Sequence, residues 1–291
     1  MGNQFTGTGV ALVTPFDEQF KVDFEALKKV VNHTVSGGVD YLVVMGTTGE
    51  SVTVGETEKN MIIQVVHENK KGKPVVIGIG GNNTASILEQ FDRVDPDQYD
   101  AILSVCPYYN KPSQKGLINH FTMIADKSPK PVILYNVPGR TSVNLSARST
   151  IELSGHPNII GIKEASGDFS QCTAIAKNTD ENFLLISGDD MLALPLIAIG
   201  ARGLISVIAN ALPDEMSRIV RYGMEGQYND AKKLLYIISD LIELMFREGN
   251  PTGVKSLLAH LGLCMDTVRP PLLNASTGLR DEIAVAMAKK G

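Results

Sequence analysis

The sequence predicts a (β/α)8 barrel of the α/β class, the TIM barrel, with a helical extension at its C-terminal end. The chain has 291 residues, and a single barrel of this type takes roughly 250 residues plus insertions. Short apolar segments recur eight times, each starting 20 to 33 residues after the previous one, which leaves room for one helix and two loops. The eight expected strands are Val10–Thr14, Tyr41–Val44, Pro74–Ile79, Ala101–Val105, Val132–Asn136, Ile159–Glu164, Phe183–Ser187 and Gly203–Val207.

These segments are continuously apolar rather than alternating, as expected for strands that are buried on both faces of a parallel sheet. The segments between them show helical spacing. Phe24, Leu27 and Val31 lie on one face of a helix that Gly37 terminates, and Thr57–Asn69 repeats the pattern. Such units fit either a closed barrel or a large doubly wound sheet. We favour the barrel because eight strands close it.

The pattern changes after the eighth segment. Residues 225–291 are predicted to be helical only, with periodic apolar positions in Tyr228–Met245 and Val254–Leu261. No Ser- or Gly-rich linker precedes them, so we expect the extension to pack on the barrel rather than to move independently. The predicted division is therefore a catalytic barrel of residues 1–224 and a helical extension of residues 225–291.

Charge and composition exclude several classes of protein. The formal net charge is −5 and no basic run is present, whereas a nucleic-acid-binding surface is cationic. The most apolar stretch, residues 191–212, contains proline, glycine, arginine and asparagine, so we expect no membrane span. Three widely spaced cysteines do not indicate a disulfide framework, and the N-terminus lacks the features of a signal peptide. We therefore expect a cytoplasmic protein that binds neither nucleic acid nor membranes.

Lys163 is the most unusual residue of the predicted strands. It follows the apolar run Ile159–Ile162, and lysine is rarely buried without a partner. Its place at the C-terminal end of a strand is where barrel active sites lie. Burial would disfavour the ammonium form, lower the pKa and supply a neutral amine that attacks a carbonyl. Two alternatives remain: an ion pair with Glu164 or another acid, and a lysine that extends to water.

Other polar residues follow the expected strands at the same end. Tyr135 ends the preceding strand, so its phenol could shuttle protons to Lys163; the alternative is a core tyrosine. Thr47 and Thr48 lie between two glycines and could bind a carboxylate, or form an ordinary tight turn. Arg140 lies in a loop at the rim, where a guanidinium suits a substrate carboxylate; the alternative is a solvated surface arginine.

Several separated motifs give the sequence a resemblance to a known family. They are Gly46-Thr47-Thr48-Gly49-Glu50-Ser51, Tyr135-Asn136-Val137-Pro138-Gly139-Arg140-Thr141 and Gly161-Ile162-Lys163-Glu164-Ala165, followed in order by Gly188-Asp189-Asp190, Leu204-Ile205-Ser206-Val207 and Asn250-Pro251. From about Thr6 to Pro271 the chain resembles the dihydrodipicolinate synthases, of the pyruvate-dependent class I aldolase group that includes N-acetylneuraminate lyase. The resemblance implies a Schiff-base condensation of pyruvate with L-aspartate 4-semialdehyde, the 4-hydroxy-tetrahydrodipicolinate synthase reaction of the diaminopimelate route to lysine.

The resemblance also implies catalytic roles for four residues. Lys163 forms the imine with pyruvate. Tyr135, Thr47 and Tyr109 form a proton relay, with Tyr109 contributed by the neighbouring subunit of a homotetramer that is built from two tight dimers. No metal or organic cofactor is implied, because the lysine itself is the electron sink.

Four further residues are implied in substrate binding. Thr48 holds the pyruvate carboxylate, and Arg140 binds the carboxylate of aspartate 4-semialdehyde and orders Tyr109. Gly188 and Ile205 offer backbone contacts near the bound substrate. Within the wider group, sialic-acid lyases resemble this chain in the lysine and tyrosine but lack the Gly-Arg-Thr that contains Arg140.

Rival functions have weaker support in the sequence. A zinc-dependent aldolase needs clustered ligands, and the five histidines have no paired spacing. A dinucleotide-binding enzyme needs a Gly-x-Gly-x-x-Gly turn, and the segment from Gly78 to Asn83 fails at the last position. A non-enzymatic binder that reuses the barrel remains an alternative, since fold does not fix function.

The resemblance points to a possible lysine-binding regulatory site, at Ser51, Glu56, Lys59, Asn82, Ser86 and Tyr108. Lysine-inhibited members of the family hold the feedback lysine at the dimer interface with a histidine and a glutamate. This chain has Lys59 and Ser86 at those positions, so a cation replaces the histidine and the acid is gone. Glu56, one helical turn before Lys59, could supply an acid. We expect lysine to inhibit weakly or not at all.

Overall fold

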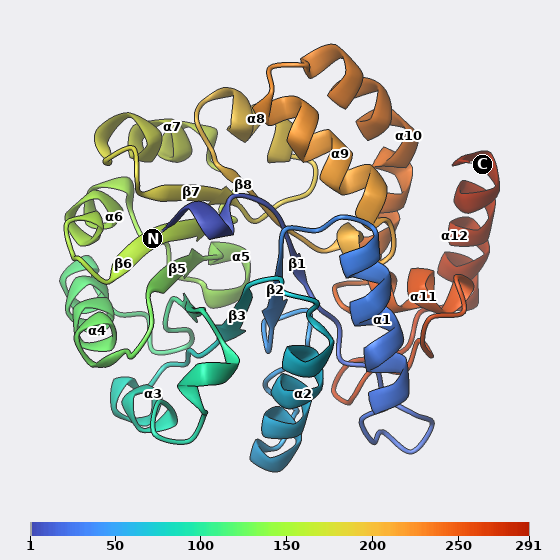
Figure 1. Cartoon of the computed structure of the whole chain (residues 1–291), viewed down its shortest axis with the longest axis horizontal. Helices are drawn as coiled ribbons and strands as arrows, with labels where there is room; N and C mark the ends of the chain where they lie inside the picture. Colours follow the sequence, from blue (N-terminus) through green and yellow to red (C-terminus); the bar gives the residue numbers. More distant parts are fainter. Residues whose placement is uncertain (1, 291) are drawn as a thin grey trace.

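Eight parallel strands close into a barrel in the computed structural model, which describes residues 2–290 (Figure 1). The first strand pairs with the second and with the eighth, and this completes the ring. The predicted barrel is confirmed, and the alternative of a doubly wound sheet is wrong. The strands are β1 (Gly7–Ala11), β2 (Tyr41–Val44), β3 (Val75–Gly78), β4 (Ala101–Val105), β5 (Val132–Asn136), β6 (Ile159–Glu164), β7 (Leu184–Ser187) and β8 (Gly203–Ser206).

The first strand is shifted three residues towards the N-terminus from its predicted position, whereas the other seven match within one residue. Gly9 lies inside β1, although glycine usually weakens a strand. Glycine is needed there because a Cβ would lie 2.3 Å from the ring of Tyr41 inside the barrel. The strand ends before Val13, whose backbone N–H donates to Oδ1 of Asn210 at 3.1 Å.

Helices surround the barrel, as Figure 1 shows. Several begin at a side chain that accepts from a backbone N–H, such as Asp23 before α1 and Ser113 before α4. The barrel helices are α1 (Phe24–Ser36), α2 (Glu56–Asn69), α3 (Thr84–Gln90), α4 (Gln114–Lys127), α5 (Pro138–Thr141), α6 (Ala147–Ser154), α7 (Phe169–Asn178), α8 (Ala193–Ala198) and α9 (Pro213–Met224), with 3-10 turns η1 (Gly2–Phe5), η2 (Pro96–Gln98) and η3 (Ile208–Asn210).

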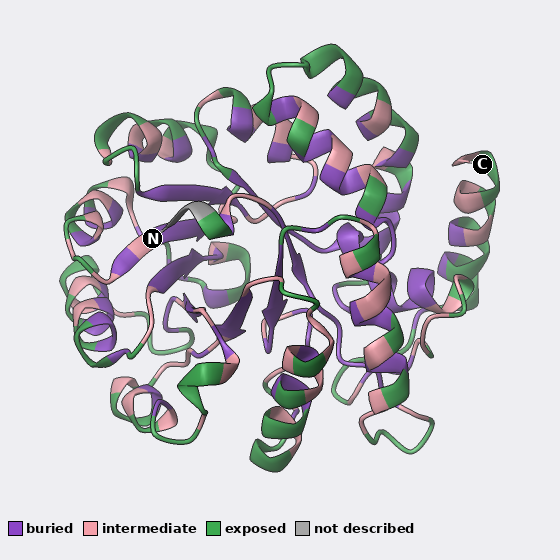
Figure 2. Ribbon diagram, in the orientation of Figure 1, coloured by how far each residue is buried: buried purple, intermediate pink, exposed green. Residues whose placement is uncertain are grey.

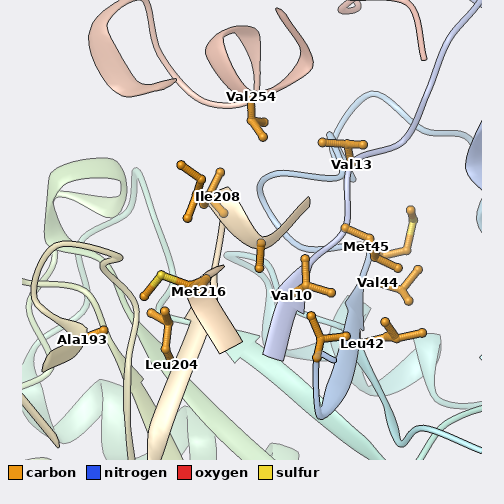
Figure 3. Close-up of a cluster of buried hydrophobic side chains, with 14 of the residues drawn as sticks. Val10, Val13, Leu42, Val44, Met45, Ala193, Leu204, Ile208, Met216 and Val254 are labelled. Carbon is orange, nitrogen blue, oxygen red and sulfur yellow. The ribbon is translucent and has the colours of Figure 1, made fainter. Parts of the chain in front are cut away.

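The buried apolar residues form two clusters. One fills the barrel, where Phe5 packs edge-on against Tyr41 with ring centroids 5.7 Å apart and closes the N-terminal end. The other lies between the strands and the helices, so the strands are buried on both faces (Figure 2). Figure 3 shows part of it, where Val10 of β1 and Met216 of α9 lie in one group of side chains. Only the C-terminal mouth of the barrel is left for polar chemistry.

The last three helices, α10 (Tyr228–Arg247), α11 (Thr252–His260) and α12 (Thr277–Lys290), continue this outer cluster. The predicted helical extension is confirmed. Its separation from the barrel at residue 225 falls at the end of α9 and stays a prediction, and residues 1 and 291 lie outside the described residues. Within residues 2–290, no helix has both the length and the apolar character needed to cross a membrane.

A buried ion pair joins the extension to the loop after β2. Nζ of Lys255 in α11 lies 2.6 Å from Oε1 of Glu50, and it also donates to the carbonyl of Thr267 at 2.8 Å. The other carboxylate oxygen of Glu50 accepts from the backbone N–H of Arg269 at 2.9 Å. Both side chains of the pair are buried, and burial lowers the pKa of Lys255 while the neighbouring Glu50 opposes that shift. The extension therefore anchors this loop.

We expect Lys255→Met to lower the free energy of unfolding by about 3–5 kcal/mol, because it leaves Glu50 buried without a counter-charge. Urea unfolding measures the change. The double variant Lys255→Met, Glu50→Gln should recover part of the loss, since no buried charge then remains unpaired. Lys233→Ala, which breaks an exposed pair with Asp230, is the control and should have little effect. Equal losses in the single and double variants would contradict this account.

Candidate active site

The C-terminal ends of the strands surround a cavity of about 860 Å³. Its lining comes from the loops after β2, β5 and β7 and from one side of α10, so it brings together residues that are far apart in the sequence. This is the end of the barrel at which enzymes of this fold carry their active sites. The polar lining residues include Thr47, Thr48, Tyr135, Arg140, Lys163, Asp189, Glu243, Arg247 and Asn250.

Lys163 and Tyr135 lie side by side on neighbouring strands. They are direct partners in the register of β5 with β6, so both side chains project into the barrel. Nζ of Lys163 lies 4.5 Å from the centroid of the Tyr135 ring. Lys163 is 5% exposed, and none of the ion pairs within residues 2–290 includes it. The site thus holds a buried amine beside a phenol, which suits nucleophilic attack on a carbonyl.

Glu164 points away from the cavity, because successive residues of a strand alternate between its faces. Its carboxylate accepts from Nδ2 of Asn136 at 3.0 and 3.1 Å, from Nε2 of Gln171 at 2.9 Å and from the backbone N–H of Ser166 at 2.8 Å. The alternative of a Lys163–Glu164 ion pair is therefore wrong. A lysine that extends to water is also wrong, given the burial of Lys163.

Sequence reasoning missed Asn136 and Glu164 as a structural pair. They are direct partners in the register, one step beyond Tyr135 and Lys163. Both are buried, and their hydrogen bonds hold the end of β5 against the end of β6. A signal was present, since each polar residue ends an otherwise apolar strand beside a site residue.

Gly188, directly after β7, makes room for the lysine. A Cβ at this position would lie 2.6 Å from Cβ of Ala165 and 3.1 Å from Cε of Lys163. Any larger residue would therefore displace the Lys163 side chain or the strand that carries it. Gly188 lines the cavity, and its backbone N–H is already used by the carbonyl of Glu164 at 2.8 Å. The backbone contact with substrate that the family resemblance implied for Gly188 stays a prediction.

Thr48 and Arg140 meet at Asn250, which lies just before α11. The hydroxyl oxygen of Thr48 accepts from Nδ2 of Asn250 at 3.0 Å, and Nη2 of Arg140 donates to the backbone carbonyl of Asn250 at 3.2 Å. Thr48 is buried, whereas Arg140 stands exposed at the rim. Thr47 is half-buried and lines the cavity. These four residues put hydroxyl, amide and guanidinium groups in the lining of the same cavity as Lys163.

Comparison with known proteins identifies the family. The chain matches the dihydrodipicolinate synthetase family over residues 4–290. It belongs to that family. A relative from Cytophaga hutchinsonii, named 4-hydroxy-tetrahydrodipicolinate synthase, is 48% identical over 98% of this chain and 96% of its own length, and one of the same name from Flavobacterium psychrophilum is 47% identical over 96% of both. A solved dihydrodipicolinate synthase structure from Aquifex aeolicus superposes with a TM-score of 0.94 at 37% identity over 98% of both chains.

Two of the residues that the family resemblance singled out do not line the cavity of this protomer. Tyr109 is 90% exposed and has a left-handed backbone (φ 73°). Ile205 is fully buried in the interior cluster, and Val207, two residues further on, lines the cavity instead. The proposed roles of these two residues stay predictions.

Asp190, the last residue of the Gly188-Asp189-Asp190 motif, is a buried residue near the site to which sequence reasoning gave no role. Its carboxyl accepts from the hydroxyl of Ser206 at 2.5 Å and from the backbone N–H of Val207 at 3.1 Å. Burial raises the pKa of Asp190 to about 6. Because Val207 lines the cavity, Asp190 fixes part of the wall by joining the loop after β7 to the end of β8.

Two buried cysteines are poor nucleophiles, and no metal site competes with Lys163 in the part of the chain that the structure describes. Within residues 2–290, no three His, Cys, Asp or Glu side chains are placed to hold a metal ion. Burial raises the pKa of Cys106 and Cys172 to about 12, with a further contribution from the Glu164 charge, so these thiols stay protonated.

A second cavity of about 640 Å³ lies at the possible regulatory site. All the residues named for that site line this cavity except Asn82. The carbonyl of Asn82 accepts from Nδ2 of Asn110 at 2.8 Å. Nζ of Lys59 lies 2.9 Å from Oε1 of Glu56, one turn earlier in α2. The charge of Glu56 is thus already paired within the protein. The two cavities share Thr47, Tyr135 and Arg140 in their linings.

We expect Lys163→Ala to abolish the adduct that borohydride traps with pyruvate. Lys255 is not expected to replace Lys163, because Lys255 is fully buried and held by Glu50 and the Thr267 carbonyl. Intact-mass measurement followed by peptide mapping locates the adduct. A pyruvate adduct on any lysine other than Lys163 would overturn the assignment.

Proposed function

We propose that the protein catalyses the condensation of pyruvate with L-aspartate 4-semialdehyde to give 4-hydroxy-tetrahydrodipicolinate, the reaction named for its relatives. It is a lyase of the class I aldolase type and acts in the diaminopimelate route to lysine. The observation that carries the proposal is the buried Lys163 amine, unpaired with any carboxylate and placed beside Tyr135 at the mouth of the barrel.

The reaction begins when the neutral Lys163 amine attacks the keto carbon of pyruvate. Tyr135 donates a proton to the departing hydroxyl, which leaves as water, and an imine results. Loss of a proton from the methyl carbon gives the enamine, which attacks the aldehyde carbon of the second substrate. The amino group of that substrate then attacks the imine carbon and displaces Lys163, which closes the ring. The balance is one water released for the two substrates joined.

The two substrate carboxylates are assigned to different groups. Thr48 holds that of pyruvate, deep in the cavity, and Arg140 binds that of aspartate semialdehyde at the rim. The burial of these residues supports this assignment, because Thr48 is buried and Arg140 is exposed where a second substrate enters. A guanidinium suits bidentate binding of a carboxylate.

A coupled assay with pyruvate and a panel of aldehydes tests the reaction. Aspartate semialdehyde should be turned over best among them. In Arg140→Ala, KM for aspartate semialdehyde should rise roughly 10- to 150-fold, as expected for a lost charge-assisted hydrogen bond. KM for pyruvate should change less. Equal rises for both substrates would indicate a general structural role for Arg140.

Tyr109 is proposed to complete the relay of Tyr135 and Thr47 in a neighbouring subunit. Its 90% exposure in the single protomer supports this, because an exposed side chain outside the lining of its own cavity is free to enter another. The assembly is proposed to be a homotetramer of two tight dimers.

Subunit mixing tests this role of Tyr109. Tyr109→Phe alone should lower turnover by about 10²–10⁴-fold, the usual contribution of a general acid–base group. Hetero-oligomers of Tyr109→Phe and Lys163→Ala subunits should regain activity, because some sites then combine an intact Lys163 with a partner's intact Tyr109. No recovery in verified hetero-oligomers would count against a shared site.

A cytoplasmic location is also proposed. Cys106, Cys172 and Cys264 are all free, which suits a reducing compartment. The small-molecule substrates are the expected partners, and neither nucleic acid nor a membrane is expected to bind.

We predict that lysine inhibits weakly, with half-inhibition above about 1 mM, which corresponds to about −4.1 kcal/mol of binding free energy. The ligand carries two ammonium groups, and its site offers Lys59 and Ser86 in place of a histidine and an acid. Glu56 does not replace the acid, because Lys59 already pairs with it. Titration of lysine into the assay at pH 8 measures the inhibition.

A gain-of-inhibition variant is the matched control for this prediction. Lys59→His with Ser86→Glu should lower the half-inhibiting lysine concentration about tenfold or more. Ser86→Glu restores an acid for an ammonium group and Lys59→His removes a like charge, and each change is worth over 1 kcal/mol at an effective dielectric near 20. Half-inhibition of the wild type below about 1 mM would show that another group completes the site.

A further inference from the structure

Asn250 contacts both groups that are assigned to the substrate carboxylates. Its side-chain amide donates to the hydroxyl oxygen of Thr48 at 3.0 Å, and its backbone carbonyl accepts from Arg140 at 3.2 Å. It is 9% exposed and lines the same cavity as Lys163. The contact with Thr48 spans 202 residues of sequence and crosses from the extension to the barrel.

The direction of the hydrogen bond between these side chains restricts what Thr48 can do. A threonine hydroxyl has one O–H to donate and two lone pairs to accept with. The N–H of Asn250 occupies one lone pair, so the O–H remains available to another acceptor. Among residues 2–290, Asn250 is the partner found for the Thr48 side chain, which lies at the cavity wall.

A carboxylate in the cavity needs a donor. An ionised carboxylate only accepts hydrogen bonds, so Thr48 can bind it only if its O–H is not donated to the protein. An amide can offer Thr48 either its N–H or its carbonyl, and only the N–H leaves the hydroxyl proton free. It is the N–H of Asn250 that faces the Thr48 hydroxyl, and Oδ1 of Asn250 is buried without a hydrogen-bond partner among residues 2–290.

We propose that Asn250 is a positioning residue, whose amide N–H holds the Thr48 hydroxyl as a donor to the substrate carboxylate. This proposal rests on the function proposed above, in which Thr48 binds pyruvate. It assigns the backbone and the side chain of Asn250 to different substrates: the carbonyl holds Arg140 for the aldehyde, and the amide holds Thr48 for pyruvate.

Asn250→Asp tests the direction of the bond. The carboxylate has nearly the shape of the amide but only accepts, so it takes the Thr48 proton away from pyruvate. We expect KM for pyruvate, and the pyruvate concentration that half-saturates borohydride trapping, to rise about tenfold or more, the size of a lost hydrogen bond to a charged group. Asn250→Ala should cause a smaller rise. It keeps the backbone carbonyl, so KM for the aldehyde should change less than KM for pyruvate.

A double-mutant cycle with Thr48→Val separates positioning from charge repulsion. Without the hydroxyl, most of the effect of Asn250→Asp or Asn250→Ala on pyruvate should disappear. Thr252→Val is the matched control, because Thr252 is buried two residues away and donates to the carbonyl of Leu273, outside the cavity lining. It should leave both KM values unchanged. If Asn250→Asp does not fold, the Asn250→Ala arm of the cycle decides alone.

Two results would overturn the positioning role. One is an unchanged KM for pyruvate in the Asn250 variants. The other is an equal rise in the Thr48→Val background, which would mean charge repulsion or general damage. Failure of the wild type to form a Lys163 adduct would instead remove the proposed function itself, so the two failures are distinguishable.

Discussion

The pairing of β5 with β6 is the contact on which the active site depends. Its register shifts between Val132 and Ile133, where two residues of β6 oppose one residue of β5. A slip of one further residue would turn Lys163 from the cavity to the outer face of the barrel. The Asn136–Glu164 hydrogen bonds lie at the opposite end of the pairing from this irregularity, one residue beyond Lys163. They fix the register where the chemistry needs it.

The second constraint comes from the other end of the chain. The loop after β2 carries Thr47 and Thr48, and residues of the extension hold it, among them Lys255 through Glu50 and Asn250 through Thr48. The barrel strands therefore place the amine and the phenol, while the extension places the groups that are proposed to receive the carboxylate. These separate roles explain why the extension packs closely on the mouth of the barrel, although its eight strands already close the barrel without it.

Most of the barrel could be predicted from the sequence, because strands buried on both faces are continuously apolar and a polar residue within them stands out. Lys163 was found in this way. The start of β1 was missed because Gly9 is required by the Tyr41 ring, a neighbour that no local pattern reveals. The pairs of Asn250 with Thr48 and of Lys255 with Glu50 could not be predicted either, since they join residues over 200 positions apart. The proposed role of Tyr109 involves a second subunit, and a single chain leaves it open.

The buried pair of Glu50 and Lys255 also restricts how the protein can change over time. A protein in which only one of the two residues is replaced has an unpaired buried charge, whereas one in which both are replaced does not. The two positions should therefore be inherited as a unit and covary among relatives, although one lies in the loop that is proposed to bind substrate and the other in the last helices. A relative whose C-terminal helices have changed so that Lys255 is replaced should therefore also have a different residue at the position of Glu50.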